Sequence, residues 1–186
     1  MPNEKSLDAA PTVALPLARP VVLVLMGVSG CGKTTVAALL AGSLHWPFEE
    51  GDALHPPANV AKMAAGHPLT DADRAPWLEK VSAWVGERLA AGENGIVTCS
   101  ALKRAYREAI AKGHRGVVFV YLAGSHQTIA ARLAARHGHF MPSTLLDSQF
   151  ADLQEPTADE PHLRVDVGPA PRAIAEHIVD ALRLSE

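Results

Sequence analysis

The chain lacks the features that mark secreted, membrane-spanning and nucleic-acid-binding proteins. It has only two cysteines, one of them Cys31 in a glycine-rich loop, which do not form a disulfide framework. No stretch approaches the roughly 20 apolar residues that a membrane-spanning helix needs. The net charge is −3 and the pI about 6.3, so no long-range attraction to nucleic acid or anionic membranes is expected. These absences favour a cytoplasmic protein with small-molecule partners, bound neither to nucleic acid nor to a membrane.

Two other kinds of site are poorly supported. The nine histidines are scattered without the spacing of a zinc site, and His137 and His139 have a single residue between them. The segment before Cys31 is similar to a lipoprotein cleavage site, but acidic residues and prolines interrupt it, so it has neither a basic start nor a clean apolar run. The same residues are better explained as a strand that leads into a phosphate-binding loop.

The strongest pattern is the octapeptide G-V-S-G-C-G-K-T at residues 27–34, which fits G-x-x-x-x-G-K-[ST]. The apolar, non-alternating run 21–26 before it predicts a strand buried on both faces, and residues 34–44 after it predict a helix. Glycines allow successive N–H groups to point at phosphate oxygens beside the positive end of a helix. A glycine turn alone would not explain the Lys-Thr pair, in which Lys33 is expected to reach the β- and γ-phosphates and Thr34 to ligate magnesium. The predicted nucleotide-binding residues are Gly27, Val28, Ser29, Gly30, Cys31, Gly32, Lys33, Thr34 and Thr35.

Strand-like and helix-like segments alternate along the chain. The strand-like runs are residues 21–26, 46–50, 95–100, 117–122 and 163–167. This rhythm predicts an α/β fold, a three-layer sandwich with a five-stranded parallel sheet and ligands at the carboxyl ends of the strands. The Ala/Pro-rich residues 1–19 are predicted to be a disordered tail, and residues 20–186 a single domain. Within that domain we expect an acceptor-binding region at 51–78 and a mobile lid at 136–155.

The marks of two other classes of phosphate-loop protein are missing. The third strand-like run, residues 95–100, ends without the Asp that supports magnesium in motor and transporter ATPases. No Asn/Thr-Lys-x-Asp tetrapeptide is present to read guanine. The class that remains is a compact kinase that transfers a γ-phosphoryl group to a small acceptor under an arginine-bearing lid.

Two carboxylates and two arginines are candidates for this chemistry. Glu50 and Asp52 alternate at a strand end, so both can face the same side. We expect Asp52 to orient the attacking hydroxyl and Glu50 to support the hydrated magnesium, because a loose transition state needs positioning more than basicity. Arg132 and Arg136 lie four residues apart and can present both guanidiniums to the phosphates. Solvated loop carboxylates and a solvated basic helix face are the alternatives. With Lys33, these residues form the predicted catalytic set.

Between residues 21 and 182 the chain resembles the gluconokinases, small P-loop kinases related to shikimate and adenylate kinases. The matching blocks are M-G-V-S-G-C-G-K-T-T at 26–35, G-D-A-L-H-P-P-A-N at 51–59, K-M-A-A-G-H-P-L-T-D-A-D-R-A-P-W-L at 62–78, C-S-A-L-K-R-A-Y-R at 99–107, R-H-G-H-F-M-P at 136–142 and L-L-D-S-Q-F at 145–150. The resemblance implies a P-loop NTPase fold of the nucleoside/shikimate kinase-like type and phosphorylation of the C6 hydroxyl of D-gluconate by ATP with Mg²⁺. It implies 6-phospho-D-gluconate and ADP as products, and a homodimer.

An acceptor of this kind is a linear polyol that ends in a carboxylate. Its pocket needs fixed donors and acceptors for hydroxyls and a cation for the acid. Similarity to the shikimate kinases makes Arg74 the first choice for the carboxylate. The alternatives are a kinase for another small hydroxy acid, such as shikimate, and a nucleotide-binding regulator without metabolite kinase activity. The predicted substrate-binding residues are Asp52, His55, Arg74, Lys103 and Arg107.

Overall fold

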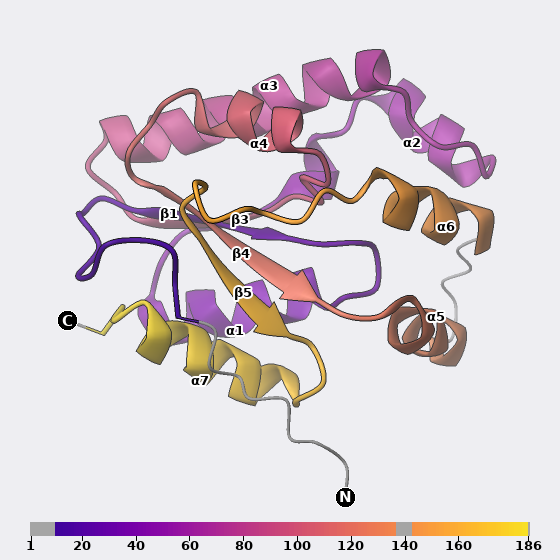
Figure 1. The fold of residues 1–186 in the computed structure, drawn as a ribbon. Helices are drawn as coiled ribbons and strands as arrows, with labels where there is room; N and C mark the ends of the chain where they lie inside the picture. The colour runs from indigo at the N-terminus through magenta and orange to yellow at the C-terminus, as the bar shows by residue number, and fades with distance from the viewer. Residues whose placement is uncertain (1–9, 137–142, 186) are drawn as a thin grey trace, which may run out of the picture.

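A parallel five-stranded sheet forms the centre of the molecule (Figure 1). The computed structural model describes residues 10–136 and 143–185. The strand order is β2-β3-β1-β4-β5. The strands are β1 (Val22–Met26), β2 (Phe48–Glu50), β3 (Gly95–Thr98), β4 (Val117–Ala123) and β5 (His162–Asp166). Each strand coincides with a run predicted from the sequence to within two residues at either end, which confirms the predicted α/β sandwich.

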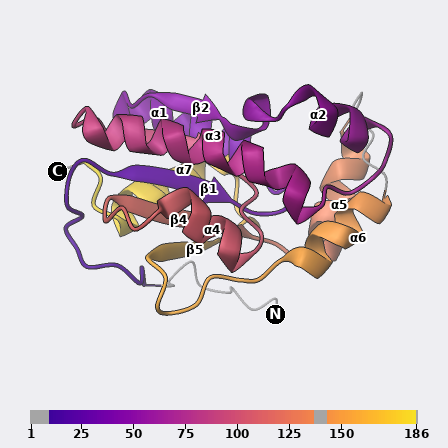
Figure 2. The ribbon, with the colours of Figure 1, turned by 90° about the horizontal axis from the view of Figure 1, so that it is seen from above.

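Helices cover both faces of the sheet. They are α1 (Lys33–Leu44), α2 (Pro57–Ala64), α3 (Asp71–Ala90), α4 (Arg104–Ala111), α5 (His126–Ala135), α6 (Ser143–Asp152) and α7 (Pro171–Ala181), with a short 3-10 helix η1 (Gly51–Leu54). In Figure 1, α1 and α7 pack below the sheet and α3 and α4 above it. Figure 2 shows α5 and α6 side by side beyond the carboxyl ends of the strands, at the same end of the molecule as α2. Among the described helices, none combines the length and apolar character that crossing a bilayer requires.

The central strand β1 is buried along its whole length. Val24 on β1 lies opposite Val97 on β3 and Phe119 on β4. Side chains on one face of the sheet join a core with α1 and α7, and those on the other face join a core with α3 and α4. Because both faces are covered, the strand is apolar without alternation, as its sequence predicted.

Helix α3 begins at a capping box. The Thr70 hydroxyl accepts a hydrogen bond from the Asp73 N–H at 3.1 Å, and the Asp73 carboxylate accepts one from the Thr70 N–H at 2.8 Å. Lys62 Nζ lies 2.6 Å from the same carboxylate. The hydrogen bond from Lys62, followed by those from Thr70, lowers the pKa of Asp73 to about 2. The start of α3, which carries Arg74, is therefore fixed by local chemistry.

The residues before β1 differ from their prediction. Thr12 donates its N–H to the His162 carbonyl at 2.9 Å and its hydroxyl to the Glu160 carbonyl at 2.7 Å. Val13 and Leu17 pack against the core beneath the sheet. The prediction of a disordered tail is therefore wrong for residues 10–19, because their apolar side chains find a surface to cover. Residues 1–9 lie outside the described residues.

Candidate active site

The phosphate loop connects β1 to α1. Gly27 has a φ of 144°, and a Cβ there would lie 2.9 Å from the Leu122 carbonyl oxygen, so only glycine fits. Gly32 precedes α1 with a φ of 100° and gives the helix no side-chain cap. The N–H groups of the first turn of α1 are therefore available to an anion, as a phosphate site requires.

Lys33 and Thr34 lie at the start of α1. Lys33 Nζ donates to the carbonyls of Gly27 at 2.9 Å and Val28 at 3.1 Å, so the side chain folds back over its own loop. The Thr34 hydroxyl donates to Glu50 at 2.6 Å, and the other carboxylate oxygen of Glu50 accepts a hydrogen bond from Thr98. A hydroxyl and a carboxylate beside a phosphate site are oxygen ligands of the type Mg²⁺ prefers. Thr34 and Glu50, each predicted separately to serve magnesium, are thus in direct contact, and their oxygens suit that ion.

The turn after β2 packs tightly against the end of β3. A Cβ on Gly51 would lie 1.7 Å from the Thr98 carbonyl oxygen, so no other residue fits there without a backbone shift. The Gly51 N–H donates to the Thr98 hydroxyl at 3.1 Å, and Trp77 Nε1 donates to the Gly51 carbonyl at 2.8 Å. These contacts fix the residue that follows, Asp52, whose side chain is 72% exposed and faces a cavity.

This cavity of about 570 Å³ lies between the phosphate loop, the η1–α3 segment and α6. It brings together five of the predicted site residues: Ser29, Lys33, Asp52, His55 and Arg74. Its other polar lining residues are Ser100, Ser148 and Gln149. Its larger apolar lining residues are Val60, Met63, Leu69, Trp77, Leu102 and Leu145. An apolar wall with a few convergent polar groups is typical of a small-molecule site.

His55 is a buried, oriented imidazole in this wall. Its ring stacks on Trp77 with centroids 4.0 Å apart. Asn59 Nδ2 lies 3.3 Å from His55 Nδ1, and because an amide nitrogen can only donate, Nδ1 accepts and Nε2 carries the proton. Nε2 lies 4.0 Å from an Asp52 oxygen. Burial lowers the pKa of His55, an effect that outweighs the nearby Asp52 carboxylate, so the ring is neutral at pH 7 and can serve as a fixed donor to a hydroxyl.

Two of the predicted substrate-binding cations, Arg74 and Lys103, are already paired with carboxylates. Arg74 Nη1 donates to the Tyr106 hydroxyl at 2.9 Å and lies 3.5 Å from Asp152 Oδ2. Lys103 Nζ lies 3.1 Å from Asp71 Oδ1 and 3.9 Å from Asp152 Oδ1. Asp152 thus faces one cation with each of its oxygens, as a bound carboxylate would. Because Asp152 is the last residue of α6, this helix contacts the predicted acid-binding groups.

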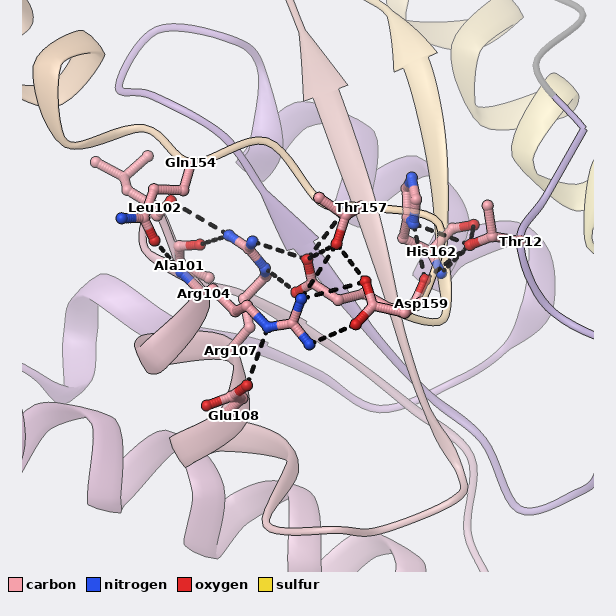
Figure 3. Close-up of polar contacts among 11 residues, drawn as sticks. Thr12, Ala101, Leu102, Arg104, Arg107, Glu108, Gln154, Thr157, Asp159 and His162 are labelled. Carbon is pink, nitrogen blue, oxygen red and sulfur yellow. Dashed lines mark hydrogen bonds and ion pairs between the residues drawn. The ribbon is translucent and has the colours of Figure 1, made fainter.

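Arg107 is placed elsewhere, contrary to its predicted contact with substrate. Its side chain is 2% exposed and forms a two-pronged ion pair with Glu160, with distances of 2.7 and 3.1 Å (Figure 3). The remaining terminal nitrogen donates to the carbonyls of Ala101 and Leu102. Burial raises the pKa of Glu160, but the hydrogen bonds from Arg107 and Thr157 outweigh this effect and hold the pKa below its ordinary value. Arg107 therefore belongs to the interior.

Helix α5, which carries the two predicted catalytic arginines, runs beside the phosphate loop, and neither arginine lines the described cavity. Leu133 of α5 packs so closely on Gly30 that a Cβ there would lie 2.7 Å from its Cγ, so α5 runs beside the loop. Arg132 is half-buried and donates to the Val167 carbonyl, and Arg136 is exposed at the end of α5. Residues 137–142 of the predicted lid lie outside the described residues. The catalytic roles of both arginines stay predictions.

One contact was missed by the sequence analysis. Within the predicted lid, α6 places Gln149 against the phosphate loop, where its Oε1 accepts a hydrogen bond from the Ser29 N–H at 2.7 Å. Leu145 and Ser148 from the same helix line the cavity. The signal was present in the L-L-D-S-Q-F block at 145–150, but sequence alone gave no partner for its polar residues.

Known proteins share these blocks and this fold. A family model described as an AAA domain matches residues 22–157. A gluconokinase of Gluconobacter oxydans (strain 621H) is 52% identical over 87% of this chain and 90% of its own length. The chain belongs to the gluconokinase family. A solved gluconokinase of Sinorhizobium meliloti 1021 superposes with a TM-score of 0.79 at 45% identity, over 88% of this chain and 92% of that one. A solved sugar kinase of Janibacter sp. HTCC2649 superposes with a TM-score of 0.84 at 42% identity, over 89% of this chain and 95% of that one. The resemblance drawn from the sequence blocks is confirmed.

Proposed function

We propose that the protein is a gluconokinase that transfers the γ-phosphoryl group of ATP to the C6 hydroxyl of D-gluconate. The observation that carries this proposal is the shared cavity of Lys33 from the phosphate loop, Asp52 and Arg74, in a chain whose relatives are gluconokinases. O6 of gluconate attacks the γ-phosphorus of ATP, and the bond between the γ-phosphorus and the β–γ bridging oxygen breaks. The hydroxyl proton passes to Asp52, and 6-phospho-D-gluconate and ADP leave.

The donor side is built from the phosphate loop, residues 27–35. In this proposal Lys33 leaves the loop carbonyls for the β- and γ-phosphates. Thr34 would ligate Mg²⁺ and Glu50 would support the hydrated ion, which would supply charge neutralisation at the phosphates. Arg132 and Arg136, from the helix beside the loop, turn to the transferring group and stabilise the charge that develops on it.

The acceptor side is built from η1, α3 and the neighbouring cations. Asp52 orients the O6 hydroxyl, and the neutral His55 donates to another hydroxyl of the chain. Arg74 binds the carboxylate with help from Lys103, which requires Asp152 to move or to share these cations. A homodimer, which follows from the family resemblance, and a cytoplasmic location, which follows from the composition of the sequence, belong to the same proposal.

An acceptor panel tests the substrate. Release of ADP is measured with gluconate, shikimate, glucose and nucleoside monophosphates, each with Mg²⁺ and ATP. We expect the highest kcat/KM with gluconate. Preference for shikimate or another hydroxy acid would overturn the substrate while leaving the kinase, and nucleotide binding without turnover on any acceptor would favour a regulator instead. Light scattering after gel filtration tests the dimer.

A further inference from the structure

The side chain of Gln149 directs both ends of its carboxamide at one residue of the phosphate loop. Oε1 accepts a hydrogen bond from the Ser29 N–H at 2.7 Å, and Nε2 donates to Ser29 Oγ at 3.1 Å. The two residues are 120 positions apart in the sequence, so the contact exists only through the fold. It occupies a backbone donor in a loop of the kind whose N–H groups bind phosphate oxygens.

Ser29 lies where the nucleotide side of the site meets the acceptor side. Of the loop residues, Ser29 and Lys33 line the cavity that also contains Asp52 and Arg74. In the proposed function the transferring group passes between Lys33 and Asp52. The N–H of Ser29, which lines this cavity, would therefore meet the terminal phosphate, whereas the N–H groups at the start of α1 would meet the inner phosphates. A carboxamide oxygen is a neutral acceptor that can stand where a phosphate oxygen would bind.

Helix α6 is held in place by other contacts, so Gln149 is not needed to anchor it. Asp152 at its end faces Arg74. Immediately beyond, the Gln154 N–H donates to the Leu102 carbonyl at 2.8 Å, and Gln154 Oε1 accepts from the Arg104 N–H at 2.9 Å (Figure 3). The contact with Ser29 can therefore break and form while the end of the helix stays attached.

We propose that Gln149 is a positioning residue that takes the place of the terminal phosphate on the Ser29 N–H. While the loop is empty, the carboxamide keeps this N–H oriented and away from competing partners. The γ-phosphate of ATP displaces it, and ADP, which has no γ-phosphate, does not. Helix α6, which also lines the acceptor cavity, thus loses its contact with Ser29 when the γ-phosphate is present and keeps it when only ADP is bound. The proposal rests on ATP being the phosphoryl donor, as in the proposed function.

The test compares the affinities of a non-hydrolysable ATP analogue and of ADP by calorimetry, without any sugar acid. In Gln149→Leu, which keeps the volume but removes the hydrogen bonds, we expect the Kd of the ATP analogue to fall by about two- to fivefold relative to that of ADP, because one competing hydrogen bond is lost. Gln149→Ala serves as a second variant if the first is poorly folded. Amide hydrogen exchange of Ser29 should be slow in the free wild type and faster in both variants.

Asp147→Asn is the matched control. Asp147 lies on the same helix but pairs with His126 of α5 at 2.6 Å and is 63% exposed, so its loss loosens α6 without touching the loop. We expect the ratio of the two affinities to stay at the wild-type value. A ratio in Gln149→Leu and Gln149→Ala that is unchanged, or that shifts against the ATP analogue, would overturn the proposal. Because these measurements involve no acceptor, they remain decisive even if gluconate proves to be the wrong substrate.

Discussion

At the scale of single residues, the positions that the sequence predicted best are those fixed by their own loop. Gly27 and Gly32 were predicted from the phosphate-loop pattern, and their positive φ angles show why glycine stands there. Asp52 was predicted from its alternation with Glu50, and the close packing of Gly51 on Thr98 explains how it is held at the cavity. The glycines were predictable because the geometry they need is local, whereas the position of Asp52 also depends on Thr98, 47 positions away in the sequence.

Asp52→Asn should lower kcat by about 10²- to 10⁴-fold, because the amide cannot accept the proton of the acceptor hydroxyl. The Kd of an ATP analogue should change little, since Asp52 has no contact with the phosphate loop in this mechanism. Steady-state kinetics and calorimetry measure the two quantities. Glu79→Gln, the same charge change on the exposed side of α3, is the control. Near wild-type turnover in Asp52→Asn would remove this residue from the reaction.

At the scale of elements, the sequence predicted the strands and most of the helices. It did not predict the contacts between elements that are far apart in the sequence. Buried strands and capped helices leave signals within a few residues, as Thr70 does for α3. Gln149 reaching Ser29 leaves no such signal, because polar residues in a predicted lid have many possible partners. Helix α6 itself was predicted only as part of a lid, since it is short and has just two buried residues, Leu145 and Leu146.

The capping box of α3 should make stability depend on acid. The pKa of Asp73 is lowered to about 2 from 3.8, so its contribution is fully present above pH 3.8 and is lost as the pH falls towards 2. Asp73→Asn removes the charge that Lys62 and the helix start stabilise. We expect the variant to unfold at lower urea concentration than wild type at pH 7, and the difference to shrink between pH 4 and pH 2. If the difference in urea midpoint between variant and wild type is constant from pH 4 to pH 2, the charge of Asp73 is not the cause of the lost stability.

The pairing of Asp152 with Arg74 and Lys103 should compete with the substrate carboxylate. We expect Asp152→Asn to lower the KM for gluconate by about two- to fivefold, a modest effect because Asp152 and Lys103 are each about 30% exposed and partly screened. The KM for ATP should stay constant. Asp147→Asn on the same helix is again the control. A higher KM for gluconate would instead mean that Asp152 helps to orient the cations for the acceptor.

At the scale of the whole molecule, ion pairs and packing between distant parts of the chain determine where some residues lie, which sequence patterns do not predict. Arg107 was predicted to bind substrate as one of the cations in the sequence blocks that match the family. Its partner, Glu160, is 53 residues away in the chain, so the pair could not be read from spacing. Residues 10–19 looked disordered by composition, yet Thr12 joins the start of β5 through hydrogen bonds to the carbonyls of Glu160 and His162.

Arg107→Met should lower the free energy of unfolding by about 3–5 kcal/mol, because it leaves the Glu160 carboxylate buried without its partner. The double variant Arg107→Met/Glu160→Leu should recover most of this loss, since it removes the stranded charge as well. Urea unfolding at pH 7 measures both. If Arg107→Met instead folds with wild-type stability but a much higher KM for gluconate, Arg107 contacts substrate after all.

The walls of the cavity come from separate segments of the chain. Its phosphate-binding wall belongs to the loop after β1, whereas much of its opposite wall comes from α2, where Val60 is a large apolar side chain left 51% exposed. Gly51, packed on Thr98, begins the segment that connects β2 to α2. Substitutions along α2 could therefore retarget the enzyme to longer, shorter or less polar acids while the apparatus for phosphoryl transfer stays as it is, so relatives with new preferences should diverge first on that helix.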